Sequence, residues 1–478
     1  MRRRSVPSLV LGLTLAVAGC DGGTNQQVDA AVQEDAPPQF DRTPGDAPPG
    51  DVLPDGAGGN HSFETAEAIA VSSTSTPGVI SAPGNVDYYK FEGTAGDWIH
   101  IHTEAATLIP ASSCDTVITL YDQAQVKLAN DDDARPALNN DSEIIYLLKA
   151  TGTYYVTVQD LTSWKVGQVP AGGSTYKYSL TVARIDVNKQ GVVHDTEPND
   201  TAAQAQAMTY YPAGSTDSRA ALIIGAFETQ DDVAVFAFNV PEHDGGVAER
   251  NMSFDLMPWG NDAVDGNAYG STTPLGEVSV TDPTGATTIA RIDNAPTDAT
   301  TKLAPALAPG DYLLWVKHPA TALGSNDFFV IKVQLRTENP PEAEAPGATG
   351  ANDTPGTAEA LAPLDLGSGR RGYFVLAHLI PADVDYFSFS VNAGERVSVS
   401  CGAARSGSGL RWLEASLRNA SDAVLSGGTV TDALSQDLRL SDITTGGTGT
   451  YYLRLQSSGQ ASGVTGDFAR CAVYPAVP

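Results

Sequence analysis

The chain has 478 residues, of which 41% are hydrophobic and 18% charged, so it is long enough to bury several separate cores. Its 57 Asp and Glu residues outweigh 28 Lys and Arg residues and give a formal net charge of -29, which argues against binding nucleic acid through the phosphate backbone. The 47 Gly and 30 Pro residues favour turn-rich β structure over helices. We therefore expect an acidic, mostly β protein of about three domains.

Residues 1–20 show the three-part pattern of a secretory signal peptide. Arginines at 2–4 are followed by an apolar run at 6–18 and by small residues before Cys20, and the run is too short to span a membrane. The end of this segment resembles a bacterial lipobox, and the resemblance implies that Cys20 is lipid-modified and becomes the first mature residue. An ordinary signal peptide with a chance Cys is the alternative. The pattern predicts a bacterial cell-envelope protein anchored to a membrane by its N-terminal lipid, with the choice of membrane left open.

Residues 21–58 have the composition of a disordered tether. They hold eight acidic residues, one Arg, six Pro and six Gly, with almost nothing that could form a core. Such a segment cannot offset the entropy lost on ordering. A flexible coil of this length spans on the order of 35 Å, so we expect the folded part to stand away from the membrane.

One ordered set of patterns occurs three times along the chain. The string N-[DH]-[ST]-x-x-x-A-x-A-[ILM] begins at Asn60, Asn199 and Asn352. Each copy continues with a strand whose aromatic residues alternate and therefore lie on one face of a sheet, and ends with a Gly-x-Tyr strand and one more alternating strand. Many short strands separated by turns predict an all-β chain of three tandem jelly-roll-like antiparallel β-sandwiches. We place these sandwiches at residues 59–186, 192–337 and 348–478.

This set of patterns resembles the bacterial pre-peptidase C-terminal domain, a jelly-roll-like β-sandwich found beside secreted peptidases. In certain collagenases the domain is the collagen-binding module. The resemblance is carried by the Glu-Pro-Asn-Asp-Thr segment at 197–201, the Asp-x-aromatic-x-Phe strands at Asp87 and Asp385, the run at 115–122 and the Gly-x-Tyr strands. It extends over nearly all of residues 60–476, so we expect no peptidase domain among them.

The resemblance also implies calcium sites, because in the collagen-binding relatives the Glu-x-Asn-Asp segment and an acidic loop hold Ca²⁺ together. Hard cations take six to eight oxygen ligands, which carboxylates from two loops can supply. In the second copy the matching residues are Glu197, Asn199, Asp200 and Asp231, while Ala234 replaces the second loop Asp. Asx turns at the start of a domain are the competing interpretation of the same residues.

The other two copies match the calcium pattern less completely. The third copy has Asn352, Asp353 and Asp385 but no Glu directly before them, which makes it the weaker candidate. The first copy keeps Asn60 and Asp87, with His61 and Gly58 in place of acidic residues. We therefore expect the second sandwich to be the principal calcium site.

Catalysis is not supported by the sequence. The chain has no HExxH, GxSxG or P-loop motif, and its seven His residues are scattered apart from His100 and His102. These two alternate with Trp98 on one strand and could hold a metal, but we favour a solvated outer face. The acidic run at 131–133 is interpreted as a solvated hairpin loop rather than a ligand set.

The cysteines are consistent with export to an oxidising compartment. Cys401 ends a strand whose inward residues are apolar, and Cys471 has the parity of the inward residues in the last strand. Both side chains can enter the same sandwich, so we predict a Cys401–Cys471 disulfide. Cys114 is then unpaired, either buried at a strand start or available to another chain.

The sequence predicts a non-catalytic, lipid-anchored envelope protein whose sandwiches bind an extracellular protein or polysaccharide, with no nucleic-acid partner. The alternatives are an enzyme, an accessory subunit that localises a secreted peptidase, or a carbohydrate-binding surface protein. Sugar binding through Trp98, Trp164 or Trp259 would require exposed rings, and burial would dismiss it. The divergent segment at 242–276 is the expected place for a specialised recognition role.

Overall fold

The computed structural model describes most of the chain after residue 58. The predicted signal peptide, Cys20 and the tether lie outside the described residues. The described residues are 59–105, 108, 112–132, 141–211, 219–242, 250–257, 268–293, 302–336, 341–344, 350–365, 370–380, 383–403, 407–410, 412–431, 438–457 and 467–476.

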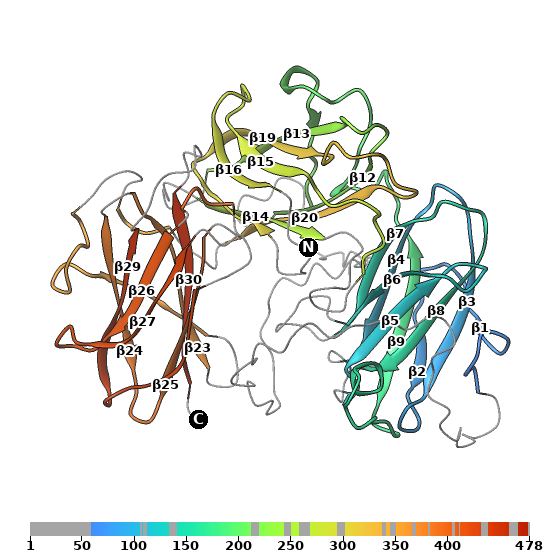
Figure 1. Cartoon of the computed structure of the whole chain (residues 1–478), viewed down its shortest axis with the longest axis horizontal. Coiled ribbons are helices and arrows are strands. Elements are labelled where there is room, and N and C mark those ends of the chain that lie inside the picture. The colour runs from blue at the N-terminus through green and yellow to red at the C-terminus, as the bar shows by residue number, and fades with distance from the viewer. Residues whose placement is uncertain are drawn as a thin grey trace, which may run out of the picture. The chain divides into compact units, whose positions relative to one another are not determined.

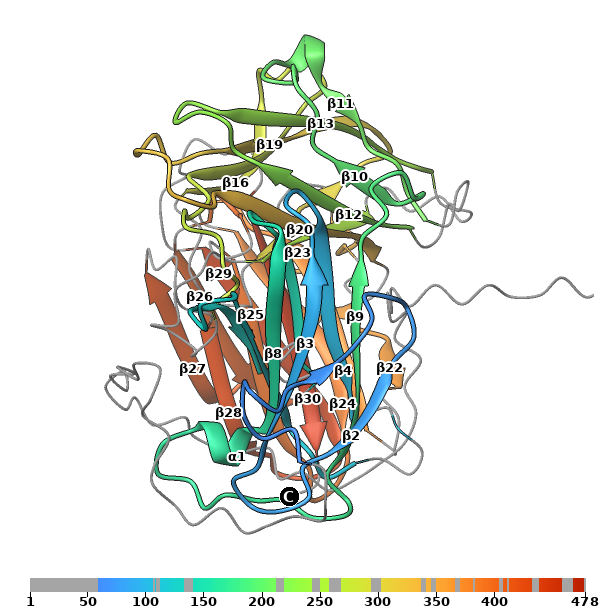
Figure 2. The same ribbon diagram turned by 90° about the vertical axis from the view of Figure 1, so that its right-hand side faces the viewer.

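The first sandwich consists of two sheets in one compact unit, which includes the described residues up to Ile185 and residues 268–270 (Figures 1 and 2). Among the described strands of this sandwich, only β1 (Glu67–Ala68) and β3 (Val86–Gly93) pair in parallel, and α1 (Leu161–Trp164) directly follows the longest of them, Gly152–Asp160. One sheet has the order β1 (Glu67–Ala68), β3 (Val86–Gly93), β8 (Gly152–Asp160), β5 (Thr116–Tyr121), β6 (Lys127–Asp131). The other has the order β2 (Thr76–Val79), β9 (Lys177–Arg184), β4 (Trp98–Glu104), β7 (Glu143–Leu147).

The second sandwich repeats this arrangement with two extra short strands, since it has eleven described strands against nine in the first. A 3-10 turn at Ala202–Gln204 lies between two of its edge strands, Val192–His194 and Gln206–Ala207. One sheet has the order β11 (Gln206–Ala207), β13 (Val233–Val240), β19 (Gly310–Lys317), β15 (Glu277–Thr281), β16 (Thr288–Asp293). The other has the order β10 (Val192–His194), β12 (Arg219–Ala226), β20 (Phe328–Arg336), β14 (Arg250–Met257), β17 (Lys302–Leu303), and β18 (Ala306–Leu307) also pairs with β14.

The third sandwich has two five-stranded sheets and belongs to the same compact unit as the second. One sheet has the order β21 (Glu359–Ala360), β24 (Val384–Val391), β29 (Gly449–Ser457), β26 (Trp412–Arg418), β27 (Val424–Thr431). The other has the order β22 (Pro363–Asp365), β23 (Arg371–His378), β30 (Phe468–Ala476), β25 (Arg396–Gly402), β28 (Leu438–Thr444). The predicted all-β fold of three tandem sandwiches is therefore confirmed.

Backbone hydrogen bonds show that the three copies are structurally equivalent. The carbonyl oxygen of the pattern's first Asn accepts a hydrogen bond from the long strand that follows it, and the Tyr hydroxyl of the Gly-x-Tyr strand donates to the carbonyl four residues earlier. The first set is Tyr88 to Asn60 (2.6 Å), Val235 to Asn199 (3.1 Å) and Tyr386 to Asn352 (2.8 Å). The second set is Tyr154 to Ala150 (2.7 Å), Tyr312 to Ala308 (2.9 Å) and Tyr451 to Gly447 (3.0 Å).

The core of each sandwich is built on the alternating aromatic residues. Their rings point inward from one face of the long strand, as the period of two requires. All six are buried: Tyr89, Phe91, Phe236, Phe238, Phe387 and Phe389.

The second and third sandwiches, which form one compact unit, share part of a core. Leu376 and Phe468 of the third sandwich belong to the core cluster of the second. The Arg291 amide also donates to the Gly407 carbonyl at 2.9 Å, which joins these two sandwiches.

The predicted Cys401–Cys471 disulfide is present. The two residues face each other directly between β25 and β30, with their Cα atoms 4.1 Å apart. Both side chains belong to the core of the third sandwich. Cys114 is a free, buried cysteine, and burial raises the pKa of its thiol.

Two expectations about the surface of the first sandwich are wrong. His100 and His102 are only 6% and 9% exposed, and their rings stack with centroids 4.6 Å apart. His100 Nε2 lies 2.8 Å from Glu143 Oε1. Asp131 is also buried, and its Oδ2 accepts a hydrogen bond from the Glu143 amide at 2.7 Å. Strand alternation suggested a solvated face for the two histidines, and the acidic run was expected to form a solvated loop, whereas His100, His102 and Asp131 are buried in the structure.

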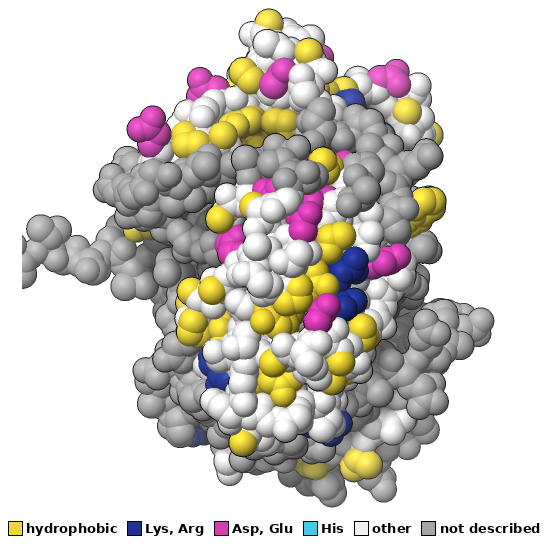
Figure 3. All heavy atoms as spheres, turned by 90° about the vertical axis from the view of Figure 1, so that its left-hand side faces the viewer, with side chains coloured by type: hydrophobic (Ala, Val, Ile, Leu, Met, Phe, Trp, Pro, Cys, Tyr) yellow, Lys and Arg dark blue, Asp and Glu magenta, His cyan; other side chains and the backbone are white. Residues whose placement is uncertain are grey.

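Hydrophobic and charged side chains are interspersed on the face shown in Figure 3. In the third sandwich, the Arg418 guanidinium carbon lies 5.9 Å from the centre of the Tyr386 ring, so the cation packs over a largely buried aromatic ring. No helix in the described part of the chain has the length and hydropathy needed to cross a bilayer.

Candidate metal centre

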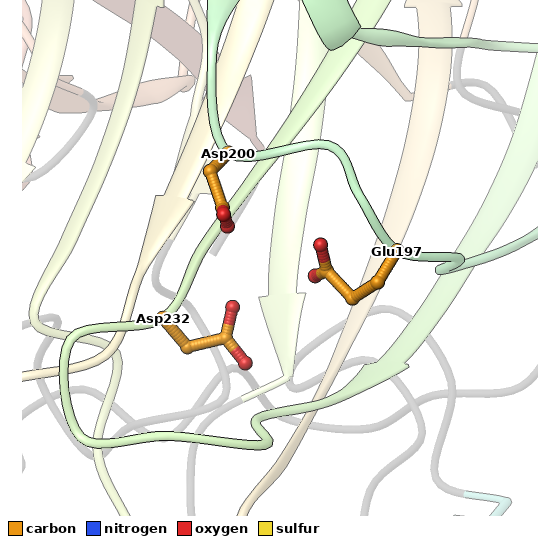
Figure 4. Close-up of side chains that lie close together, drawn as sticks. All are labelled: Glu197, Asp200 and Asp232. Carbon is orange, nitrogen blue, oxygen red and sulfur yellow. The ribbon is translucent and has the colours of Figure 1, made fainter.

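Three carboxylates meet at one end of the second sandwich. Glu197 and Asp200 come from the segment between β10 and the 3-10 turn, and Asp232 directly precedes β13. One oxygen from each lies within 4.8 Å of the other two. Figure 4 shows the three carboxylates turned towards one another. This spacing suits a divalent cation coordinated by carboxylate oxygens.

Asn199 organises the segment that carries Glu197 and Asp200. Its backbone amide donates to Glu197 Oε2 at 2.9 Å, and its side-chain nitrogen donates to Asp195 Oδ1 at 2.7 Å. Asn199 is only 1% exposed, and its Oδ1 has no hydrogen-bond partner among the described residues. A buried acceptor costs free energy unless it finds a partner, so this oxygen is suited to a metal ligand.

The electrostatics of the cluster also favour a cation. Burial, and then the nearby carboxylates of Glu197 and Asp232, together raise the pKa of Asp195 to about 7, against the lowering effect of the hydrogen bond from Asn199. Burial likewise raises the pKa of Glu197, with additional contributions from Asp200, Asp232 and Glu228. The charged groups that act on these two pKa values are all acidic, and a bound divalent cation would relieve their mutual repulsion.

The predicted ligand Asp231 does not belong to this cluster; its neighbour Asp232 does. Asp231 is exposed, whereas Asp232 is buried and its Oδ2 accepts a hydrogen bond from the Glu228 amide. The Asp232 amide also donates to the Thr229 carbonyl, which closes a turn before β13. This turn directs the carboxylate of Asp232, and not that of Asp231, into the cluster. The sequence alone could not show which of the two adjacent Asp residues points inward.

The third sandwich gathers a larger group of buried acidic side chains at the equivalent place. Asn352 and Asp385, both predicted, are joined by Glu344 and Asp383. With its amide oriented to satisfy its neighbours, the Asn352 nitrogen donates to Asp385 Oδ1 at 2.9 Å and to Glu344 Oε2 at 2.8 Å. Asp353, the third predicted residue, accepts a hydrogen bond from the Gly350 amide through Oδ1.

Several oxygens of this second cluster are buried without a partner. Glu344 Oε1, Asp383 Oδ2 and Asp385 Oδ2 have no hydrogen-bond partner among the described residues. Burial, and then the charge of Asp383, raises the pKa of Asp385 to about 8. Burial, and then the charge of Glu344, raises the pKa of Asp383 to about 6. Unpartnered buried oxygens from two separate loops form a ligand set of the kind that Ca²⁺ requires.

The sequence suggested that the third copy has no counterpart of Glu197, because no Glu directly precedes Asn352. In the structure, Glu344 takes that place. The Glu342 amide donates to the Leu376 carbonyl just as the Asp195 amide donates to the Ile224 carbonyl in the second sandwich. Glu344 therefore stands where Glu197 stands, but residues 345–351 separate it from Asn352. The segment that leads into the third sandwich thus begins at Pro341, which pairs with Leu376, ahead of the expected boundary at 348.

The first sandwich fills the corresponding place with protein groups. Tyr178 donates its hydroxyl hydrogen to Asp87 Oδ2 at 2.5 Å, and His61 Nδ1 lies 3.7 Å from Asp87 Oδ1. The Asn60 side-chain nitrogen donates to the Tyr88 carbonyl at 3.0 Å. The buried carboxylate is therefore partnered by a tyrosine and a histidine.

The fold of the first sandwich agrees with a comparison against known families. Residues 85–160 match the bacterial pre-peptidase C-terminal domain. The resemblance expected from the repeated motifs is confirmed by this match, which spans β3 to β8 of the first sandwich.

One curated protein and two solved structures illustrate the similarity. A probable subtilase-type serine protease of Deinococcus radiodurans is 38% identical over 80 residues, which is 17% of this chain and 10% of that protein. The pre-peptidase C-terminal domain of a Bacillus anthracis collagenase is 19% identical, with 24% of this chain and 93% of that chain covered and a TM-score of 0.18. The tandem CBM51 modules of a family 98 glycoside hydrolase from Streptococcus pneumoniae SP3-BS71 are 9% identical, with 54% and 84% covered and a TM-score of 0.18.

The chain spans only a tenth of the length of the curated protease that it matches. The similarity therefore concerns a stretch of 80 residues and not the whole protease.

The predicted aromatic sugar-binding residues are not presented together. Trp98 is only 3% exposed, which dismisses this ring as a stacking surface. Trp164 in α1 is half-buried, and Trp259 lies outside the described residues.

Proposed function

We propose that this chain is a non-catalytic, lipid-anchored binding protein of the bacterial cell envelope, in which Ca²⁺ stiffens the second and third sandwiches. The observation that carries the calcium assignment is the set of buried, unpartnered oxygens at equivalent places in two copies. These oxygens belong to Asn199 in the second sandwich and to Glu344, Asp383 and Asp385 in the third. Leaving such groups unpaired is costly, and a cation satisfies them together.

The ligand residues fall into two sets of similar design. Each set takes a Glu and an Asn-Asp pair from the segment that leads into the sandwich, and an Asp from the turn before the long strand; the third set adds Asp385 from the strand itself. In the second sandwich they are Glu197, Asn199, Asp200 and Asp232, and in the third they are Glu344, Asn352, Asp353, Asp383 and Asp385. Two loops far apart in sequence are thereby tied to each other, so the ion would rigidify that end of each sandwich.

The binding role is supported by the matched family and by the predicted export signal. The family match covers a β-sandwich module, and residues 1–20 have the pattern of a lipoprotein signal peptide. The envelope placement and lipid anchor rest on that pattern. We propose an extracellular protein or polysaccharide as the partner.

The calcium part is tested with the chain from residue 21 onward, which retains every described residue. Isothermal titration with CaCl₂ should show two sites, and calcium should raise the melting temperature relative to EDTA. At a calcium concentration 100 times the dissociation constant, the gain in free energy of unfolding is about 2.7 kcal/mol per site. Asp232→Asn should remove one site, and Asp383→Asn the other.

Asp231→Asn is the matched control, because this neighbour of Asp232 has the same charge but lies outside the cluster. It should leave both sites intact. Absence of saturable binding, or equal losses in Asp231→Asn and Asp232→Asn, would contradict the calcium assignment.

The anchor is tested separately in a bacterial host. The full chain should fractionate with membranes and carry acyl chains on Cys20, as read by mass spectrometry of the N-terminal peptide. Cys20→Ser should release it into the soluble fraction. A chain that starts after residue 20 without any lipid would contradict the anchor while leaving the calcium proposal untouched.

A second candidate, an accessory role beside a secreted peptidase, is favoured by one specific observation. The matched stretch of 80 residues also occurs within a probable subtilase-type serine protease. Co-purification of the chain with a secreted protease from its own host would support this role over an independent binding protein.

A further inference from the structure

The turn that carries Asp232 is fastened at both ends to the segment between β19 and β20. Residues 227–232 join β12 to β13, and residues 318–327 join β19 to β20. The His318 amide donates to the Asp232 carbonyl at 3.0 Å, and the Phe227 amide donates to the Asp327 carbonyl at 3.1 Å. The first and last residues of the turn are therefore each bonded to one end of the other segment.

The side chain of His318 adds a third contact, to the middle of the turn. Its Nδ1 lies 3.0 Å from the carbonyl oxygen of Gln230. A carbonyl oxygen only accepts, so Nδ1 carries the hydrogen and donates it. The imidazole also packs edge-on against the Phe227 ring, with centroids 5.1 Å apart and planes 72° apart. The His318 side chain is 0% exposed, so water does not compete for this hydrogen bond.

Asp327 fixes the orientation of the imidazole. Its Oδ2 lies 3.3 Å from His318 Nε2 and accepts a hydrogen bond from the Gly324 amide at 2.6 Å. Its Oδ1 accepts a hydrogen bond from the Thr272 hydroxyl at 2.5 Å. Both oxygens of this buried carboxylate therefore have partners, and Nε2 of the imidazole faces one of them.

Thr272 belongs to the divergent segment at 242–276, for which the sequence predicted a recognition role. Its amide donates to the Asn326 carbonyl at 3.0 Å, and its hydroxyl accepts a hydrogen bond from the Asn326 amide at 2.9 Å. A Cβ at residue 324 would collide with the Thr272 hydroxyl, so Gly324 permits this close approach. Thr272 is thus locked onto the loop that carries Asp327.

The imidazole at this position is particular to the second sandwich. The strand registers place Asp160 of the first sandwich and Ser457 of the third at the position of His318. The Asp160 carboxylate caps α1 by accepting a hydrogen bond from the Thr162 amide. A feature that occurs in one of three equivalent copies points to a need of that copy rather than of the shared fold.

The second sandwich has such a need, because a strand position that is acidic in the other copies is apolar here. Ala234 occupies the strand position of Asp385. Asp232 is therefore the one carboxylate that the proposed calcium site takes from the turn and the strand after it. Turns are held by fewer hydrogen bonds than strands and are more mobile unless other segments support them.

We propose that His318 and Asp327 are positioning residues for the calcium site of the second sandwich. They hold the turn in the form that presents the Asp232 carboxylate to the ion (Figure 4), and Thr272 holds Asp327. This inference deepens the calcium assignment proposed above and rests on it. A carboxylate that is in place before the ion arrives loses less entropy on binding, and removal of such supporting groups lowers metal affinity by about 10–100-fold.

The test isolates the second site in an Asp383→Asn background, in which the third site should be lost. Isothermal titration with CaCl₂ uses the chain from residue 21, at a temperature at which circular dichroism shows every variant to be folded. His318→Gln should weaken calcium binding by about tenfold or more, because its side-chain nitrogen stands near Nε2 and does not reach the Gln230 carbonyl. His318→Asn should retain most of the affinity, because its side-chain nitrogen stands near Nδ1 and donates to that carbonyl.

The far end of these contacts is tested at an exposed residue, so that the variant folds. Thr272→Val removes the hydroxyl that donates to Asp327. It should weaken calcium binding by less than His318→Gln does, because a second hydrogen bond still holds the carboxylate. Thr273→Val is the matched control, since its hydroxyl donates to the Pro274 carbonyl, and it should leave calcium binding unchanged.

A purely structural role of His318 predicts different results. General destabilisation would also weaken the third site, so His318→Gln in an Asp232→Asn background should bind calcium as that background alone does. Equal losses in His318→Asn and His318→Gln would overturn the inference, because the contact with Gln230 would then not act on the site. Unchanged affinity in His318→Gln would also overturn it, and the calcium assignment would still stand if the unaltered chain binds calcium at both sites. An unaltered chain that binds no calcium would overturn both.

Discussion

The hydroxyl of Tyr178 donates to Asp87 Oδ2 at 2.5 Å, and the hydroxyl of Tyr89 lies 2.7 Å from that of Tyr178. All three residues are buried in the first sandwich. Asp87 occupies the strand position of Asp385, whose Oδ2 has no partner among the described residues of the third sandwich. A side-chain hydroxyl thus satisfies the carboxylate in one copy, and we assign that role to a cation in the other.

This relationship predicts that Tyr178→Phe destabilises the first sandwich without affecting calcium. Removal of the hydroxyl takes one partner from a buried carboxylate, which should cost about 1–3 kcal/mol of unfolding free energy. Chemical denaturation followed by the fluorescence of Trp98, which is buried in the same sandwich, would measure the loss. The calcium titration should not change. A variant as stable as the unaltered chain would show that this hydrogen bond contributes little.

The pattern of the repeats predicted the fold well but the ligand atoms less well. Alternating aromatics such as Phe236 and Phe238 must enter the core whatever the loops do, so local sequence determined their place. The choice of Asp232 over Asp231 depends on a turn, and Glu344 reaches its site across an insertion. Those positions depend on backbone geometry that adjacent sequence does not encode.

The sequence also failed to predict that some strand residues are buried by segments distant in the chain. His100 and His102 alternate with Ile99 and Ile101, so a two-faced strand suggested that they face water. All four are buried in the structure, because both faces of β4 are covered. Strand periodicity reports which residues share a face, and it does not report what covers that face.

The raised carboxyl pKa values predict an unusual pH dependence in the calcium-free protein. The pKa of Asp385 is about 8 and that of Asp195 about 7, against a usual value of 3.8. Between pH 4 and 8 the folded state therefore holds more protons than the unfolded state, and stability falls as the pH rises. The melting temperature in EDTA should decrease from pH 5 to pH 8, as followed by circular dichroism.

Calcium should remove this dependence, because the cation binds the deprotonated carboxylates. Calcium affinity should therefore rise with pH over the same interval, since the metal competes with protons. Asp385→Asn should make the pH profile in EDTA less steep, with the contribution of Asp195 remaining, while Asp231→Asn should leave the profile unchanged. A calcium-free protein whose stability rises between pH 5 and 8 would contradict the buried, protonated state of these groups.

The Cys401–Cys471 disulfide should contribute substantially to the stability of the third sandwich. It closes a loop with a sequence separation of 70, for which the chain-entropy model gives about 4 kcal/mol and engineered cases often give less. The double variant Cys401→Ala/Cys471→Ala should lower the unfolding free energy by about 2–4 kcal/mol. A reducing agent should lower the stability of the unaltered chain to a similar extent and leave the double variant unchanged.

Cys114→Ala is the control for this experiment, because Cys114 is free and lies in another sandwich. Its stability should respond to reductant as that of the unaltered chain does. Equal stability of the double variant and the unaltered chain would mean that the paired strands β25 and β30 already hold the two residues together without the covalent bond.

The repeated tyrosine hydrogen bond predicts a small, equal contribution in each copy. Tyr154 and Tyr451 each donate to the carbonyl four residues earlier, at the start of the Gly-x-Tyr strand. Tyr154→Phe and Tyr451→Phe should each cost about 0.5–1.5 kcal/mol of unfolding free energy, measured by denaturant titration. Tyr155→Phe, next in the strand but half-buried on the opposite face, is the control. A larger loss in the control would place the stabilising contact elsewhere.

Hydrogen exchange should distinguish the three copies by their response to calcium. In the second and third sandwiches, an ion would tie the leading segment to the turn before the long strand, so amides near Asn199 and Asp383 should exchange more slowly with Ca²⁺ than with EDTA. In the first sandwich Tyr178 and His61 already partner Asp87, so amides near Asn60 should exchange at the same rate in both conditions. Protection in all three copies would mean that calcium acts on the chain as a whole, and the separate ligand sets derived for the second and third sandwiches would then be wrong.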